Sequence, residues 1–425
     1  MDMIGRVRKI SRQILDLGKK LPLQVFIRVK KGILVRFTNN GVHQNGFQDL
    51  FSYTFRFVGR GGPVYLESND CSKDGIQDAL KRFLTLIPTS RPLRVLKKMN
   101  YPIVREHFPL VFKKVPEMAA EAIEKGLDLI RRKKASANGY YSTYERLFYF
   151  VDSNGLELFH PTTAVRFGVT ITKGSGKGYF GFYHPNPEQL NVTSVVNEAI
   201  QLAEQASSRE VLVKPGEYEC IFSPRAFIEL IEPLRHHFDS QLYRKARSVF
   251  SRSLGKRIFS EAFTLLDDVT YPGQFGIPFD LEGAAKKKVI LVDRGVLKGL
   301  LGEGSSTRGI REYPTYPENL VGEGGNLTLP SLFKRIERGI FINKVRYHTL
   351  VREAGMEITG LLTAGSLYIE KGRVLGRVGH LRYHDSLLSI LRSIRGQTKE
   401  QILLKDGEGG AALFPYFWIS KLRVV

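Results

Sequence analysis

The chain has 425 residues, 42% of them hydrophobic, which is enough to fill the cores of two or three domains of ordinary size. Lysines and arginines number 64 against 42 aspartates and glutamates, and the net charge of +22 favours contact with acidic or polyanionic partners. The two cysteines, Cys71 and Cys220, form no CxxC pair, which excludes a cysteine-rich zinc site and a disulfide framework, and no apolar stretch reaches the ~20 residues that cross a bilayer.

The first half begins with a helix and continues with strands. Residues 6–17 place apolar side chains at helical spacing between basic ones, which predicts an amphipathic helix that packs on its own domain. Strands, turns and a second helix then follow, because alternating apolar residues are separated by Asn-Gly and glycine-rich segments. The strands are expected at 25–29, 33–37, 51–57 and 64–66, the turns at 39–41 and 59–62, and the helix at 73–87.

The same order of elements recurs further along the chain. Strands are expected at 147–151, 165–171 and 179–183, turns at 153–155 and 174–178, and a helix at 192–206 with Asn191 as its N-cap. The Asn-Gly pairs and the glycine-rich turns recur at nearly the same offset. Two strand-turn-strand-helix units therefore indicate an internal duplication within an antiparallel-sheet domain.

A helix at 115–130 separates the two units and is followed by a basic, tyrosine-rich segment, Arg131–Tyr144. Lysines and arginines beside tyrosines can bind single-stranded nucleic acid through charge and stacking. Cations also favour a helix C-terminus, and Gly139 favours a turn, so helix capping and loop packing is the preferred interpretation.

We expect a domain boundary near residues 206–216, giving an N-terminal α+β domain over 1–210 and a C-terminal β-rich domain over 211–425. Strands outnumber helices there and do not alternate strictly with them, which favours an α+β fold. The strands are expected at 218–222, 263–266, 289–292, 296–301, 340–345, 358–362, 366–369 and 416–424, and the helices at 224–234 and 385–394.

Motifs for common chemistry are missing. The glycine that a phosphate loop needs before Gly176-Lys177 is replaced by Ile171, and there is no Gly-x-Ser-x-Gly nucleophile elbow. His380 and His384 have the i, i+4 spacing of a helical metal pair, but the helix is expected to begin only near Asp385, so a metal there is not favoured.

Four segments of the second half, read together, resemble the TldD/PmbA family, also known as modulators of DNA gyrase. Lys214-Pro-Gly-Glu-Tyr-Glu-Cys-Ile-Phe-Ser-Pro resembles the entry to the family's C-terminal domain. Pro278-Phe-Asp-Leu-Glu-Gly, with the hairpin 289–299 behind it, resembles its D-x-EG … G-x-L segment. Residues 317–325 and 365–372 resemble two further glycine-containing stretches.

The resemblance implies a heterodimer of two branches, in which the TldD branch carries the zinc signature His-Glu-x-x-x-His and a further ligand nearer the C-terminus. Here that signature aligns with Ile231, Glu232 and His236, so an aliphatic side chain stands where the first ligand belongs. The chain thus resembles the PmbA or TldE branch. This implies no catalytic residue, cofactor or metal of its own, and a TldD-like catalytic partner that holds the zinc.

The same resemblance implies a cytoplasmic subunit of a complex that processes unfolded peptides, without membrane contact and with a homodimer possible when the partner is absent. Two alternatives stay open. The charge allows a basic nucleic-acid- or gyrase-associated binding protein. The adjacent His236, His237 and Asp239 allow an autonomous metal-dependent hydrolase, although neighbouring residues on a regular element point in different directions.

Overall fold

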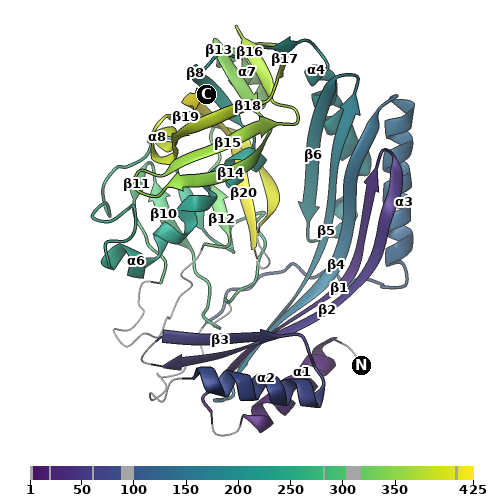
Figure 1. Cartoon of the computed structure of the whole chain (residues 1–425), viewed down its shortest axis with the longest axis vertical. Coiled ribbons are helices and arrows are strands. Elements are labelled where there is room, and N and C mark those ends of the chain that lie inside the picture. The colour runs from purple at the N-terminus through teal and green to yellow at the C-terminus, as the bar shows by residue number, and fades with distance from the viewer. Residues whose placement is uncertain are drawn as a thin grey trace.

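The computed structural model describes residues 3–18, 21–59, 62–87, 100–280, 283–302, 317–406 and 410–425. Figure 1 shows a long, curved sheet A that faces a more compact sheet B. The chain begins at the lower end of sheet A and ends on sheet B. None of the described helices is long and apolar enough to span a membrane.

Sheet A contains six strands among the described residues, all antiparallel, in the order β3-β2-β1-β4-β5-β6. Each predicted unit supplies three neighbouring strands, and β1 pairs with β4 at the centre, so the structure confirms the duplicated order of elements. The elements are α1 (Met3–Leu17), β1 (Gln24–Thr38), β2 (Gly41–Gly59), β3 (Gly62–Ser68), α2 (Lys73–Leu86), α3 (Val115–Arg132), β4 (Ser136–Asp152), β5 (Glu157–Lys173), β6 (Gly176–His184), the short η1 (Pro187–Gln189) and α4 (Val192–Ala206).

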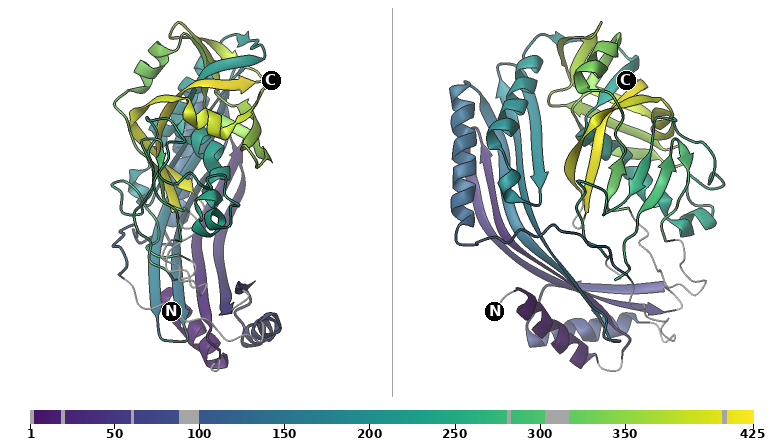
Figure 2. Two further views of the ribbon diagram at one scale, coloured as in Figure 1. Left: turned by 90° about the vertical axis from the view of Figure 1, so that its left-hand side faces the viewer. Right: turned by 180° about the vertical axis from the view of Figure 1, so that it is seen from behind.

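The four helices cover one face of sheet A. Along β1, Val25, Ile27 and Val29 pack with α1 and α2, whereas Ile33 and Val35 pack with α3 and α4. Alternate residues of a strand share a face, so the opposite face of β1 is directed toward sheet B. The right-hand view of Figure 2, from behind, shows α3 on the side of sheet A that lies away from sheet B.

Several local predictions for this half are confirmed. The Asn39-Asn40 turn adopts positive φ at both residues, as the tight hairpin requires. The Asn191 side chain accepts a hydrogen bond from the backbone N–H of Ser194 at 3.0 Å and so caps α4.

Three predictions for sheet A are wrong in detail. The strands expected at 25–29 and 33–37 form one continuous strand, β1. The turn expected at 174–178 is confined to Gly174-Ser175. In the segment Arg131–Tyr144, Arg131 and Arg132 lie in the last turn of α3, as the capping interpretation expects, but residues 136–144 are the first part of β4 and not a loop. Gly139 lies within the strand, where a side chain would come 2.3 Å from the carbonyl oxygen of Gly168. The tip of the turn expected at 59–62 lies outside the described residues.

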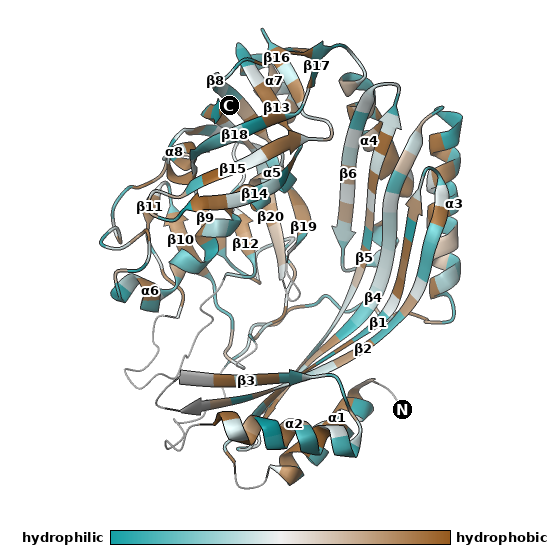
Figure 3. Ribbon diagram, viewed as in Figure 1, coloured by the Kyte–Doolittle hydropathy of each residue, from teal (hydrophilic) through white to brown (hydrophobic). Residues whose placement is uncertain are grey.

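Sheet B is mixed and contains fourteen strands among the described residues. They are β7 (Glu210–Val211), β8 (Gly216–Phe222), β9 (Leu265–Asp267), β10 (Val289–Asp293), β11 (Val296–Leu297), β12 (Leu320–Gly322), β13 (Arg338–Ile342), β14 (Lys344–Arg352), β15 (Glu357–Thr363), β16 (Leu367–Glu370), β17 (Arg373–Val378), β18 (Leu381–Ser386), β19 (Ile394–Asp406) and β20 (Gly410–Val424). In Figure 3, strands such as β9 and β12 are largely hydrophobic, as expected for strands with buried faces.

Short helices complete this half: α5 (Pro224–Ile231), the 3₁₀ helix η2 (Glu232–Phe238), α6 (Ser240–Arg244), α7 (Leu329–Arg335) and α8 (Leu387–Arg392). Phe227 of α5 stacks on Phe417 of β20 with ring centroids 4.0 Å apart, which anchors α5 in the main core. The helix expected at 224–234 thus ends at Ile231, and the helix expected from 385 is preceded by strand β18. The strand expected at 296–301 is reduced to β11.

The chain passes from one sheet to the other near residue 210. Helix α4 still packs on β5 and β6, whereas β7 already pairs with β17 of sheet B. The exact boundary of two domains at 210/211 remains a prediction. The halves make apolar contact where Phe26 and Phe150 of sheet A meet Ile277 and Phe279.

Candidate functional sites

The residue that the family resemblance aligns with the first position of the zinc signature is part of the hydrophobic core. Ile231 is the last residue of α5, and 2% of its surface is exposed. Its side chain belongs to the same cluster as Phe227 and Leu234. The local sequence builds this helix firmly, since Ser223 caps it by accepting from the N–H of Ala226 at 3.1 Å. The side chain at position 231 is therefore aliphatic, buried in the core and without a donor atom for a metal.

The second position is held in an ion pair. A carboxylate oxygen of Glu232 lies 2.7 Å from Nε of Arg235, which is 3% exposed. The guanidinium of Arg235 also donates to the carbonyl oxygen of Pro317 at 3.1 Å. A carboxylate engaged in this way is not positioned as a free general base.

The third position, His236, belongs to a small cluster that sequence reasoning identified only in part. The rings of His236 and His237 lie 4.0 Å apart, and their Nε2 atoms are 3.9 Å and 3.8 Å from a carboxylate oxygen of Glu353. The potential ligand atoms of these three residues lie within 4.8 Å of one another. Asp239, the third member considered from sequence, instead caps α6 by accepting from the N–H of Gln241 at 2.7 Å.

The surroundings of His237 favour a tautomer that cannot bind zinc through Nε2. Its Nδ1 lies 3.4 Å from the N–H of Val249, which makes Nδ1 the acceptor and leaves the proton on Nε2. Zinc would need Nε2 as its unprotonated ligand atom. Burial lowers the pKa of His237 to about 4, so the ring is neutral at pH 7. The residues aligned with the signature likewise offer zinc no complete ligand set.

The other metal candidates are not assembled either. His384 lies on β18, and His380 lies just before that strand, so the pair does not share a helical face. In the described part of the chain, His236, His237 and Glu353 are the only group of three or more histidine, cysteine or acidic side chains whose ligand atoms lie this close together. Both cysteines are free, and burial raises the pKa of each thiol, which disfavours the thiolate that binds zinc.

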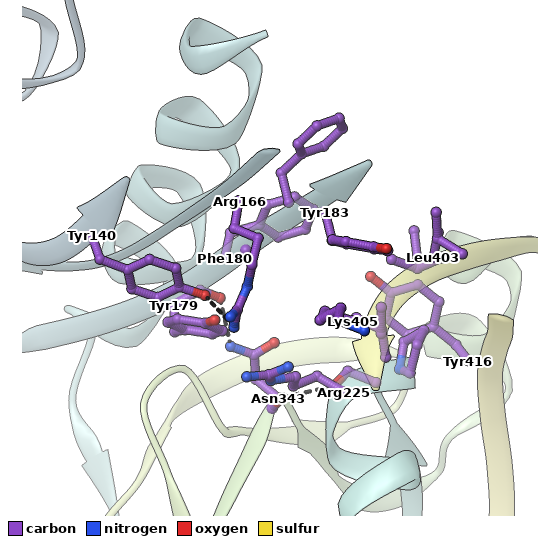
Figure 4. A pocket seen from close by; sticks show the side chains of 16 residues that line it. Tyr140, Arg166, Tyr179, Phe180, Tyr183, Arg225, Asn343, Leu403, Lys405 and Tyr416 are labelled. Carbon is purple, nitrogen blue, oxygen red and sulfur yellow. Dashed lines mark hydrogen bonds between the residues drawn. The ribbon is translucent and has the colours of Figure 1, made fainter. Parts of the chain in front are cut away.

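A second site lies between the two sheets and is shown in Figure 4. The space between atoms there is about 570 Å³, a figure that includes the open solvent at its mouth. Its lining joins residues from seven stretches of the sequence: Tyr140, Arg166, Tyr179, Phe180, Gly181, Phe182, Tyr183, Ser223, Pro224, Arg225, Asn343, Ile402, Leu403, Leu404, Lys405 and Tyr416. We call this the intersheet pocket. Of its residues, Tyr140 lies in the basic, tyrosine-rich segment, and Ser223 and Pro224 end the first segment that resembles the family.

The basic, tyrosine-rich segment does not form a stacking surface. Tyr141 and Tyr144 are each 2% exposed, so their faces are not available to bases. Asn40 ties the start of this segment to the first hairpin, since it donates to the carbonyl oxygen of Ala135 and accepts from the N–H of Ala137. The segment therefore has a structural role in sheet A.

Known proteins share this architecture. Residues 215–425 match the profile of the PmbA/TldA metallopeptidase C-terminal domain. The solved structure of TldE from Thermococcus kodakarensis superimposes with a TM-score of 0.83 at 19% identity, covering 98% of this chain and 99% of that one. A metalloprotease of Methanocaldococcus jannaschii is 25% identical over 240 residues, which are 52% of this chain and 51% of that protein. The metalloprotease TldD homolog of Buchnera aphidicola is 25% identical over 239 residues, 52% of this chain and 48% of that protein.

The fold and the matched domain define a metallopeptidase-related α+β protein. The aligned part spans about half the length of the two relatives matched by sequence. The chain belongs to the TldD/PmbA family, as its four motif segments predict.

Proposed function

We propose that this chain is the non-catalytic, TldE-like subunit of a TldD–TldE-type metallopeptidase complex. The observation that carries the proposal is Ile231: the residue aligned with the first zinc ligand is aliphatic, and its side chain is buried in the core. The ion pair between Glu232 and Arg235 supports the same conclusion for the general base. In this proposal the chain holds no metal, and a TldD-like partner supplies the zinc.

The proposed substrates are unfolded peptides, and the chain contributes surface that holds them beside the partner's active site. The two unpaired cysteines favour a reducing compartment, so we place the complex in the cytoplasm.

The test is co-expression with a TldD-like protein, followed by measurement of the mass of the complex and of peptide cleavage. We expect a complex that contains both chains, cleavage that a chelator stops, and no cleavage by this chain alone. Zinc measured per chain should be far below one for the isolated protein. Chelator-sensitive cleavage by the isolated chain, together with one zinc per chain, would contradict the proposal and favour the autonomous hydrolase.

A further inference from the structure

The intersheet pocket has two walls from different parts of the chain. Tyr140 on β4, Arg166 on β5 and Tyr179 on β6 come from sheet A. Arg225 at the start of α5 and Lys405 on β19 come from the sheet B half. Figure 4 shows Arg166 reaching from sheet A toward the side where Asn343 and Arg225 lie. A ligand in this space would therefore touch both halves at once.

The pocket carries an excess of positive charge. Three of its lining residues are basic, and none is acidic. A fourth cation, Lys344, places Nζ 4.1 Å from the centre of the Tyr179 ring. The nearby carboxylate of Glu229 lies 3.6 Å from Nε of Arg225 and so offsets part of this charge.

Among the described residues, neither Arg166 nor Arg225 has a partner for every hydrogen-bond donor and charge of its guanidinium group. Arg166 donates to the hydroxyl of Tyr140 at 3.3 Å and, among the described residues, forms no ion pair with a carboxylate. Nε of Arg225 is buried and has no hydrogen-bond partner within the described part of the chain. Buried donors and unbalanced charges cost free energy, and an anion that accepts from both guanidinium groups would offset that cost.

The other residues that line the pocket indicate the chemistry of the rest of the ligand, beyond its anionic group. Phe180, Phe182, Ile402 and Leu403 supply apolar surface beside the cations. Burial raises the pKa of Tyr179 and, more strongly, of Tyr183, so both hydroxyls stay neutral and can donate hydrogen bonds. The walls therefore suit a carboxylate joined to an apolar body. The basic groups gather at one place, whereas a nucleic-acid strand presents phosphates at regular intervals and needs a track of cations.

We propose that the intersheet pocket binds the C-terminal carboxylate of an unfolded peptide, with Arg166 and Arg225 on the carboxylate and the apolar wall on the terminal side chain. This inference rests on the proposed function, because it states how a non-catalytic subunit would hold the peptide. It also gives a role to the basic side chains that converge in the pocket. The residues aligned with the zinc signature are not among the pocket's lining residues.

The test is fluorescence anisotropy with the full chain and three labelled peptides of one unfolded sequence ending in phenylalanine. One peptide has a free C-terminus, one is amidated, and one is amidated with an internal glutamate. The free acid should bind about 10- to 100-fold more tightly than either amide, the range expected for charged hydrogen bonds. An amidated glutamate peptide that binds as well as the free acid would overturn the assignment to the terminus.

Arg166→Gln and Arg225→Gln should each weaken binding of the free acid about tenfold or more, and Arg225→Lys should bind with intermediate affinity because it keeps the charge but loses the planar fork. Arg373→Gln, an exposed position on β17, is the matched control and should bind as the parent does. Emission of Trp418, the only tryptophan, and the melting temperature establish that each variant is folded.

Equal binding of free acid and amide by the folded parent protein would overturn the proposal. Unchanged affinity in a folded protein that carries both Arg166→Gln and Arg225→Gln would also overturn it. Tighter binding of an oligonucleotide, lost in the same arginine variants, would overturn it in favour of a phosphate ligand. The proposed subunit role and the proposed carboxylate pocket can each be refuted without the other. Carboxylate-dependent binding without a TldD-like complex would refute only the subunit role, whereas an active complex with carboxylate-independent binding would refute only the pocket.

Discussion

Replacing Ile231 by histidine restores the missing residue of the zinc signature in sequence but not in structure. We expect Ile231→His to lose stability and to gain neither stoichiometric zinc nor peptide cleavage. The new imidazole would lie in the core, where Phe227 and Leu234 surround the native side chain. The Glu232–Arg235 pair would remain, and no cysteine follows Cys220 to supply a thiolate as the further ligand that the family carries nearer the C-terminus.

The expected loss of stability follows from the burial of Ile231, which is 2% exposed. Removing a buried isoleucine side chain costs roughly 2–3 kcal/mol of transfer free energy. Burying a polar ring without a hydrogen-bond partner adds about 1–3 kcal/mol. The free energy of unfolding should therefore fall by roughly 3–6 kcal/mol, and by more below pH 6, where a proton taken up in the unfolded state must be removed on folding.

Urea unfolding followed by Trp418 emission measures this loss, because Trp418 lies on β20 in the same half of the molecule. Two controls bracket the result. Ile231→Val should cost only about 0.5–1.5 kcal/mol, and Ile290→His, at a position that is 43% exposed, should change stability little. An Ile231→His protein as stable as the parent that binds one zinc and cleaves peptides would refute the reasoning.

Three further predictions concern the fold. Gly32→Ala should destabilise sheet A by about 1–3 kcal/mol in urea unfolding, because its Cβ would lie 2.2 Å from the carbonyl oxygen of Thr143, whereas Gly46→Ala, with nothing within 4 Å, should not. Burial lowers the pKa of His348 from 6.5 to about 4; the unfolded chain takes up this proton first, so stability should fall as the pH drops from 6.5 toward 4. His348→Gln should weaken that dependence, and His237, whose pKa burial lowers in the same way, should account for the rest. Asn343→Ala should loosen the contact between the halves by about 1–3 kcal/mol, seen as faster limited proteolysis, because its Nδ2 donates to the carbonyl oxygens of Tyr179 and Ala364 at 2.9 Å each; unchanged proteolysis would argue against this bridge.

Elements with strong local signals were predictable from the sequence. Helix α4 has an apolar stripe and an asparagine N-cap, and it spans residues 192–206 as expected. The duplication was visible because each unit repeats its turns, and turn chemistry depends on neighbouring residues alone.

Elements specified by distant partners were missed. The first part of β4 follows the basic residues 131–134 and contains Gly139, which favours a loop locally, but it pairs with β1 on one side and β5 on the other. Likewise, β18 takes its strand conformation from β15 and β20. Tertiary pairing overrides weak local propensity in both cases.

The same distinction applies to the sites. That Ile231 has no donor atom for a metal follows from the sequence, because residue identity alone decides whether a side chain can be a ligand. Its proposed place in a degenerate zinc signature stays a prediction. Glu353 beside His236 was not predictable, since more than one hundred residues separate them and only the fold brings them together. The intersheet pocket gathers single residues from strands far apart in sequence, so no local pattern marks it.

The residues aligned with the zinc signature and those of the intersheet pocket differ in whether the fold alone satisfies their polar groups, and this difference indicates different roles. At the motif, hydrocarbon and an internal ion pair satisfy the fold without any ligand, so its residues contribute stability. In the intersheet pocket, arginines from both halves converge without enough carboxylates to match them, an arrangement that the fold alone does not require. Changes that keep the core packed at Ile231, such as valine, should therefore leave peptide affinity unaltered, while neutral replacements of Arg166 or Arg225 should lower affinity without comparable loss of stability. If instead the arginine variants unfolded and the variants at Ile231 lost peptide binding, the two roles would be reversed. The pocket would then stabilise the fold, and the residues around Ile231 would bind the peptide.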